Sequence, residues 1–213
     1  MTPPHGKYIV IEGHDGVGKS TQIELLAEYF RKQGKKVLTT KEPGGGIPSV
    51  DDIRKILKDK SYNLEDITNV LLFTANRCEL WQKVIEPALA QGQIVISDRN
   101  WWSTLAYECS GMGVDKHLVT DLTTQCLPKR YVKPDFGVIL ALDEAERIKR
   151  INIRDNITRT DAFESRPDDF QKRVAEGYAE IAKEYRISTI DAAPSPEEIH
   201  KQIIACIFPQ TRL

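Results

Sequence analysis

The sequence has few cysteines, and they carry no metal-binding or redox spacing. Its 213 residues include four, which are Cys78, Cys109, Cys126 and Cys206. They form neither a Cys-x-x-Cys pair nor a zinc-type cluster with histidine, so we expect reduced thiols and a cytoplasmic location. The sequence also lacks an apolar run near the roughly 20 residues that span a bilayer, and its amino terminus lacks a signal-peptide core. We therefore expect no membrane partner.

An excess of charge of either sign is also absent. The 30 Lys and Arg residues nearly balance the 31 Asp and Glu residues, which leaves a net charge of -1. This balance gives no general attraction to nucleic acid, so we expect no nucleic-acid partner and only local phosphate recognition. The length and a 40% hydrophobic content fit one domain, residues 1–213, with a substantial core.

What the sequence does contain is a glycine-rich phosphate-binding pattern near its amino terminus. Residues 7–22 read as an apolar strand, then Gly-x-x-x-x-Gly-Lys-Ser, then a helix. Gly13 and Gly18 allow the backbone to approach a polyphosphate, and the loop N–H groups converge on its oxygens. Lys19 is expected to reach the outer phosphates, and Ser20 to bind Mg²⁺. A chance match in an ordinary strand–helix turn is the alternative.

The rest of the chain alternates strands and helices. Further strands are expected at Lys36–Thr40, Gln93–Arg99, Phe136–Leu142 and Ile187–Ile190. Helices are expected after the phosphate loop, at Asn63–Ile85 with Asn63 as N-cap, at Ser103–Ser110, at Asp115–Leu127, from Glu144, at Phe170–Tyr185, and after Ser195 as N-cap. This order predicts an α/β fold, a three-layer sandwich with a five-stranded parallel sheet.

Two polar segments follow predicted strands, where open parallel sheets bind ligands. The first is the loop Lys41–Pro48, with three consecutive glycines, which is either a ligand-binding loop or a surface turn. The second is Asp98-Arg99, where the acid could serve Mg²⁺ and the base could clamp phosphate, or the two could form an ion pair at the strand end.

Other features are open to two interpretations. The aromatic cluster Trp101, Trp102 and Tyr107 could be core or the wall of a base pocket. The basic segment after Glu144 could be a solvated face, or a lid that closes over a transferring phosphoryl group. Taken alone, Phe73 could be ordinary packing and Arg77 a surface charge.

Together these motifs resemble the thymidylate kinase family of nucleoside monophosphate kinases over essentially the whole chain. The resemblance rests on Ile11–Gln22, Lys41–Gly45, Leu71–Arg77, Asp98-Arg99 with Ser103 and Ala106-Tyr107, and Glu176–Tyr178. It implies a P-loop fold with a short lid, about residues 150–167. It also implies that ATP phosphorylates dTMP to dTDP, with Mg²⁺ as cofactor, in a homodimer formed through helices near 63–85 and 103–110.

The resemblance further implies roles for individual residues. ATP is bound by Gly13, His14, Asp15, Gly16, Val17, Gly18, Lys19, Ser20, Thr21 and Arg150. The acceptor dTMP is bound by Asp15, Glu42, Pro43, Arg54, Phe73, Arg77, Arg99, Ser103 and Tyr107. Mg²⁺ is held by Ser20 and Asp98, partly through water, with Glu42 in support. Catalysis involves Lys19, Arg99 and the lid residues Arg154 and Arg159, since Gly16 puts no arginine in the phosphate loop.

Within these roles, Phe73 would stack on thymine and Arg77 would bond its edge. Asp15 would hold the 3′-hydroxyl, and Tyr107 would crowd the 2′ position. The sequence departs from the family pattern at Asn100, where an aromatic residue or histidine is usual, and at Ala162, where an arginine is usual. A kinase for another nucleoside monophosphate or deoxynucleoside, and a P-loop nucleotide switch that is no kinase, remain as alternatives.

Overall fold

The fold is organised around a parallel sheet. The computed structural model describes residues 6–155, 163 and 166–208. Its five strands are β1 (Lys7–Gly13), β2 (Val37–Lys41), β3 (Ile94–Asp98), β4 (Phe136–Ala141) and β5 (Ser188–Asp191). They pair in the order β2-β3-β1-β4-β5, and every pair is parallel. The predicted five-stranded parallel sheet is confirmed.

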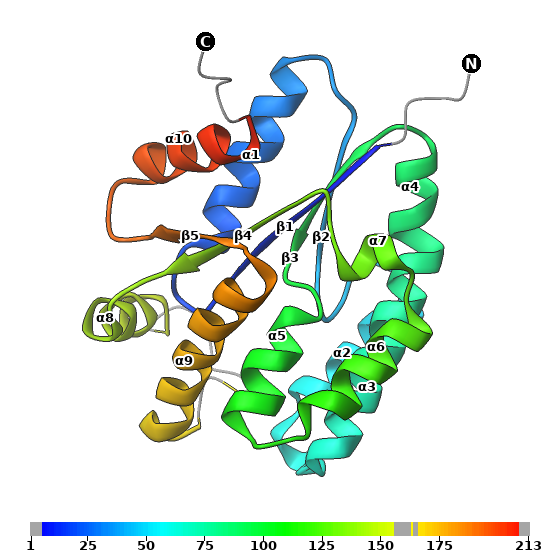
Figure 1. Cartoon of the computed structure of the whole chain (residues 1–213), viewed down its shortest axis with the longest axis vertical. Coiled ribbons are helices and arrows are strands. Elements are labelled where there is room, and N and C mark those ends of the chain that lie inside the picture. The colour runs from blue at the N-terminus through cyan, green and yellow to red at the C-terminus, as the bar shows by residue number, and fades with distance from the viewer. Residues whose placement is uncertain (1–5, 156–162, 164–165, 209–213) are drawn as a thin grey trace.

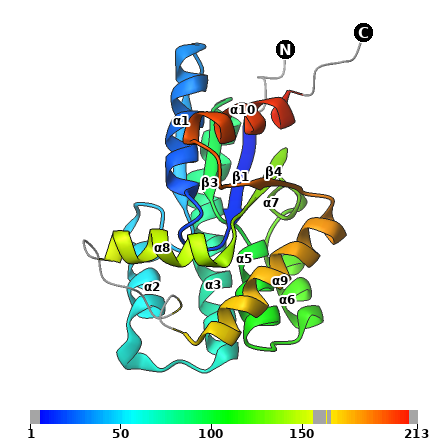
Figure 2. The same ribbon diagram turned by 90° about the vertical axis from the view of Figure 1, so that its left-hand side faces the viewer.

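Helices cover both faces of this sheet (Figure 1). In chain order they are α1 (Lys19–Lys32), α2 (Pro48–Lys58), the 3₁₀ turn η1 (Lys60–Tyr62), α3 (Asp66–Leu80), the π-helical η2 (Trp81–Ile85), α4 (Glu86–Ala90), α5 (Trp102–Thr104), the π-helical η3 (Leu105–Gly111), α6 (Lys116–Cys126), α7 (Lys129–Val132), α8 (Glu144–Asp155), α9 (Asp168–Tyr185) and α10 (Pro196–Ile207). Helices α1 and α10 pack on one face. Helices α4, α5 and α9 pack on the other face. Helix α8 runs across the carboxyl ends of the strands (Figure 2). In the described part of the chain, no helix has the length and apolarity needed to cross a bilayer.

Strand β1 lies at the centre of the sheet and separates two cores. Tyr8 and Val10 belong to the core beneath α4 and α9, whereas Ile9 and Ile11 belong to the core beneath α1 and α10. All four side chains are essentially buried. A strand covered on both faces needs apolar residues at every position, which explains the continuous apolar run before the phosphate loop.

The predicted helix at Asn63–Ile85 is wrong at both ends. Asn63 has φ 40° and ends the turn η1, while α3 begins at Asp66 with Glu65 at its N-cap. Asparagine tolerates the left-handed region, which suits it to ending a turn as well as to capping a helix. At the other end the helix continues through η2 into α4, because Pro87 lies in the first turn of α4, where proline is tolerated.

The predicted start of the last helix is confirmed. Ser195 accepts a hydrogen bond from the Glu198 backbone N–H, and the Glu198 carboxylate accepts one from the Ser195 N–H. Pro196 occupies the first turn. This capping box satisfies backbone donors that the helix cannot satisfy itself.

Close packing of α9 on η3 yields a first prediction. A Cβ atom built on Gly177 would lie 2.6 Å from Ser110 Cβ and 3.3 Å from Ala106 Cα. Alanine favours a helix interior by about 1 kcal/mol over glycine, but overpacking costs about 1–3 kcal/mol. Gly177→Ala should therefore lower the free energy of unfolding in urea. The exposed neighbour Glu176→Ala serves as control, and a Gly177→Ala protein more stable than wild type would contradict the packing.

Candidate active site

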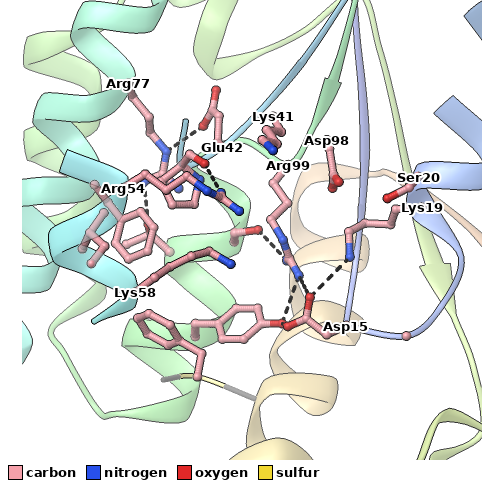
Figure 3. A pocket seen from close by; sticks show the side chains of 18 of the residues that line it. Asp15, Lys19, Ser20, Lys41, Glu42, Arg54, Lys58, Arg77, Asp98 and Arg99 are labelled. Carbon is pink, nitrogen blue, oxygen red and sulfur yellow. Dashed lines mark hydrogen bonds and ion pairs between the residues drawn. The ribbon is translucent and has the colours of Figure 1, made fainter. Parts of the chain in front are cut away.

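A cavity of about 400 Å³ lies at the carboxyl ends of the central strands (Figure 3). Sixteen of the predicted site residues line it, namely Asp15, Gly16, Gly18, Lys19, Ser20, Thr21, Glu42, Pro43, Arg54, Phe73, Arg77, Asp98, Arg99, Ser103, Tyr107 and Arg150. Gly13, His14 and Val17 are buried in the phosphate loop without lining this cavity. Arg159 and the Arg154 side chain lie outside the described residues. The structure thus brings together segments that are up to 135 positions apart, from Asp15 to Arg150.

The phosphate loop is wound tightly between β1 and α1. Gly13, Gly16 and Gly18 have φ values of 136°, 85° and 91°, in the region that disfavours other residues. A Cβ atom on Gly13 would lie 2.4 Å from the Leu140 carbonyl oxygen, so a side chain there has no room. Lys19 Nζ donates to the carbonyl oxygens of Gly13 and His14, both at 3.0 Å. Burial lowers the pKa of Lys19.

Arg99 projects into the middle of the cavity from the end of β3 (Figure 3). Its backbone has φ 76°, an uncommon conformation for a residue with a side chain. Its guanidinium donates to Asp15 at 2.6 Å, to Tyr178 Oη at 2.8 Å and to Ser103 Oγ at 3.0 Å. The phenol of Tyr107 also donates to Asp15, at 2.8 Å. Although burial acts in the opposite direction, Arg99 and Lys19 hold the pKa of Asp15 well below its usual value.

Glu12, near the end of β1, accepts hydrogen bonds from residues that contact Arg99 or follow it in the chain. Its fully buried carboxylate accepts from the backbone N–H groups of Asn100 and Ser103, at 2.8 and 3.2 Å, and from the Ser103 hydroxyl. It also accepts from Tyr178 Oη of α9, at 2.9 Å. One carboxylate therefore fixes the turn after β3 and the hydroxyls that contact Arg99. Sequence reasoning missed this role, and the only signal was an acid within an apolar strand.

Arg77 is not a solvated surface charge. It is 3% exposed and its Nε donates to Glu42 at 2.9 Å, while its terminal nitrogens donate to Thr104 Oγ1 and the Asn100 carbonyl. The same Glu42 carboxylate accepts from Tyr131 Oη at 2.7 Å. Burial raises the pKa of Glu42 to about 7, against the lowering effect of Arg77. Glu42 thus faces Arg77, rather than Ser20 and Asp98, in the described structure.

Aromatic rings close the cavity on the side of α3. The Arg77 guanidinium lies 5.3 Å from the Phe73 ring centroid, and the Phe163 ring lies 5.9 Å from Phe73 and 6.0 Å from Tyr107. Trp101 and Trp102 are 1% and 4% exposed and belong to the core. Of the aromatic cluster, only Tyr107 walls the cavity.

The departure at position 100 has a structural explanation. The Asn100 side chain accepts a hydrogen bond from the Trp102 backbone N–H at 2.9 Å, while its carbonyl accepts from Arg77. Asparagine therefore supports the turn into α5 without entering the cavity. The departure at Ala162 lies outside the described residues.

Ser20 and Asp98 offer oxygen ligands that suit Mg²⁺. Both line the cavity, and Asp98 Oδ1 is buried with no hydrogen-bond partner among the described residues. A buried carboxylate oxygen without a partner is costly unless a cation or water satisfies it. No group of three or more His, Cys, Asp or Glu that could hold a metal occurs within the described residues. Such a sparse set fits Mg²⁺, which keeps several waters and binds substrate phosphates.

Arg150 and Arg54 line the cavity from two different helices. Arg150, on α8, donates to the Ala192 carbonyl at 3.0 Å and to Glu146 at 3.2 Å. Arg54, on α2, donates to the Pro43 carbonyl. Six further lining residues were not predicted as site residues, and these are Lys41, Leu57, Lys58, Thr104, Glu108 and Phe163.

The sheet, the phosphate loop and the second set of charged and aromatic side chains define a P-loop protein of the nucleoside monophosphate kinase type. The family model for thymidylate kinase matches residues 11–203. The chain belongs to the thymidylate kinase family.

Individual relatives agree over nearly the full length. The chain is 38% identical over 208 residues to a thymidylate kinase from Nitrosospira multiformis, covering 95% of this chain and 98% of the relative. It is 38% identical to a probable thymidylate kinase from Thermococcus onnurineus over 207 residues, covering 94% and 96% of the two chains. A crystal structure of thymidylate kinase from Ehrlichia chaffeensis matches with a TM-score of 0.73 and 31% identity, covering 94% of this chain and 97% of that one.

The buried carboxylate of Glu12 yields a second prediction. In Glu12→Gln an amide N–H₂ would face donors from Asn100, Ser103 or Tyr178. Leaving buried donors unpaired costs about 1–3 kcal/mol each, so unfolding should become easier by about 2 kcal/mol or more. Tyr178→Phe, which removes a single hydroxyl, should cost about 1 kcal/mol in the same denaturant titration. Wild-type stability in Glu12→Gln would show that these donors have other partners.

Proposed function

We propose that this chain transfers the γ-phosphoryl group of ATP to the phosphate of dTMP, giving ADP and dTDP in the biosynthesis of dTTP. The observation that carries the proposal is that a single cavity is lined by two different sets of residues. The phosphate loop and Ser20 form one side, and Phe73, Arg77 and Tyr107 form the other. A nucleotide switch needs only the first set. The relatives reported above, named as thymidylate kinases, support a kinase with this acceptor.

On the donor side, the phosphate-loop N–H groups and Lys19 bind the β- and γ-phosphates. Lys19 exchanges its carbonyl partners in the loop for phosphate oxygens when ATP binds. Ser20 and Asp98 would hold Mg²⁺, partly through water, and the bound ion would neutralise negative charge on the phosphates of ATP. Arg150 lies against adenine, and its bond to the Ala192 carbonyl supports a fixed position for that contact.

On the acceptor side, Phe73 stacks on thymine and Arg77 bonds the edge of the base. Asp15 holds the 3′-hydroxyl, and Tyr107 crowds the 2′ position and so favours deoxyribose. Asp15 and Tyr107 are already joined by a hydrogen bond of 2.8 Å, which fixes their relative positions.

The acceptor phosphate is bound by Arg99, with Arg54, Ser103 and the loop residues Glu42 and Pro43 completing the acceptor side. Arg99 aligns that phosphate with the γ-phosphoryl group, since such transfers depend on positioning and charge neutralisation.

A lid over residues 150–167 supplies the remaining positive charge. We propose Arg154 and Arg159 for this role, because Gly16 stands where an arginine could otherwise reach from the phosphate loop. A cation over the transferring group stabilises the charge spread over its oxygens.

We also propose a cytoplasmic homodimer formed through α3. Ile67 and Leu71 on α3 are 43% and 49% exposed, which supports an interface on this helix. The second helical region expected there contributes less, since Leu105 and Ala106 are buried in the core of the chain itself.

The third prediction concerns Lys19. Lys19→Ala removes the charge that meets the outer phosphates, so turnover with dTMP should fall by about 10³-fold or more. The measurement is coupled ADP release, with thermal melting to check the fold and the exposed Lys35→Ala as control. Near-normal dTMP phosphorylation by Lys19→Ala would contradict the proposal. If the wild-type protein phosphorylates UMP, CMP or thymidine in preference to dTMP, the proposed acceptor is wrong. If dTMP does not stimulate ADP release, a nucleotide switch is favoured.

A further inference from the structure

Glu108 is a buried carboxyl group in the acceptor half of the cavity that the proposed roles leave unused. It follows Tyr107 in η3, is 1% exposed and lines the cavity together with Phe73 and Arg77. A carboxyl group is almost never fully buried without a partner, because burial penalises its charged form. Its position therefore calls for a partner.

The described structure leaves part of this group without a partner. Oε1 of Glu108 is buried and has no hydrogen-bond partner among the described residues. Glu12, another buried acid of the chain, has both carboxylate oxygens satisfied by donors from the turn after β3 and from α9. Glu108 thus differs from Glu12 in having a buried carboxyl oxygen that no described residue pairs, on a side chain that lines the cavity.

The surroundings of Glu108 favour its neutral form. Burial raises its pKa to about 8, although three arginines act to lower it. These are Arg77 on α3, Arg166 ahead of α9 and Arg99 ahead of α5. On its own element the titratable neighbours are Tyr107 and Cys109, and burial raises the pKa of both of them. At neutral pH the side chain is therefore mainly a carboxylic acid, which offers an O–H donor beside a C=O acceptor.

We propose that Glu108 is a specificity-determining residue that recognises the hydrogen-bonding edge of the acceptor's pyrimidine as a neutral carboxylic acid. The proposal rests on the dTMP kinase function and deepens it. Phe73 and Arg77, the proposed contacts of the base, line the same cavity as Glu108, and Arg77 is a charged neighbour of Glu108. The C=O of Glu108 accepts from thymine N3–H, and its O–H donates to the adjacent carbonyl oxygen of the base.

Ionisation of Glu108 breaks this pairing. A carboxylate can still accept from N3–H, but its second oxygen then faces a thymine carbonyl oxygen, and two acceptors repel. The bound base therefore favours the protonated acid, so dTMP binding draws a proton onto Glu108 at pH values above its pKa. Glutamine offers the same donor and acceptor pair without titrating in this range. Glu108→Gln is therefore the matched control.

The first experiment measures the KM for dTMP of wild type and Glu108→Gln between about pH 6.5 and pH 9.5, at saturating Mg²⁺ and ATP. In wild type, KM should stay level up to about pH 8 and then rise by up to about tenfold per pH unit. In Glu108→Gln it should match wild type at pH 7 within about threefold and lack that rise. Ionisation of the thymine base itself would affect both proteins equally.

The second experiment has a readout other than activity. Calorimetric titration with dTMP at about pH 8.5, in buffers of different ionisation enthalpy, measures the protons taken up on binding. Wild type should take up a substantial fraction of one proton more than Glu108→Gln, and melting temperatures confirm that both proteins are folded. Equal proton uptake, or the same pH-dependent rise of KM in both proteins, overturns the role of Glu108 while leaving the kinase function intact. Failure of wild type to bind or phosphorylate dTMP at pH 7 overturns the function itself.

Discussion

The position of Arg99 is the constraint on which the rest of the site depends. Its backbone lies in the left-handed region, and its guanidinium bonds Asp15, Ser103 and Tyr178. A strained backbone of this kind persists only where surrounding bonds hold it. Two of these partners, Ser103 and Tyr178, donate to Glu12, which therefore contacts both the turn after β3 and α9. The cation at the centre of the cavity is therefore fixed before any substrate arrives.

Such preorganisation suits phosphoryl transfer. The reaction needs alignment and compensation of negative charge more than covalent chemistry from the protein. The parallel sheet makes this possible, because β1 and β3 are neighbours and end at the same edge, with Ile11 paired to Asp98. The phosphate loop after β1 and the Asp98-Arg99 pair after β3 thus face one cavity. Helix α9 adds Tyr178 from a distant part of the sequence.

Features carried by contiguous patterns could be predicted from the sequence. The phosphate loop, the five strands and the N-cap at Ser195 depend on neighbouring residues, and the structure confirms them. The π-helical segments η2 and η3 could not be predicted from a 3.6-residue periodicity, since their hydrogen bonds follow another spacing. Asn63 was assigned to the wrong element because asparagine suits both helix starts and left-handed turns.

The cavity residues also divide into those that a local sequence pattern predicts and those that only the folded structure reveals. Lys19, Phe73 and Arg99 belong to local motifs and could be identified by resemblance. The parts played by Glu12 and Glu108 depend on contacts between segments that are far apart in the sequence, and nothing in their immediate sequence reveals them. An acid in an apolar segment signals a buried polar contact, but its partner appears only once the chain is folded.

The most direct test of this account is a crystal structure with dTMP and a non-hydrolysable ATP analogue. The account predicts the thymine ring against Phe73, and the dTMP phosphate bonded to Arg99. It also predicts that Arg99 keeps its left-handed backbone and its contact with Tyr178. A dTMP phosphate bound away from Arg99, or an Arg99 side chain that leaves the Glu12 network when dTMP binds, would contradict it.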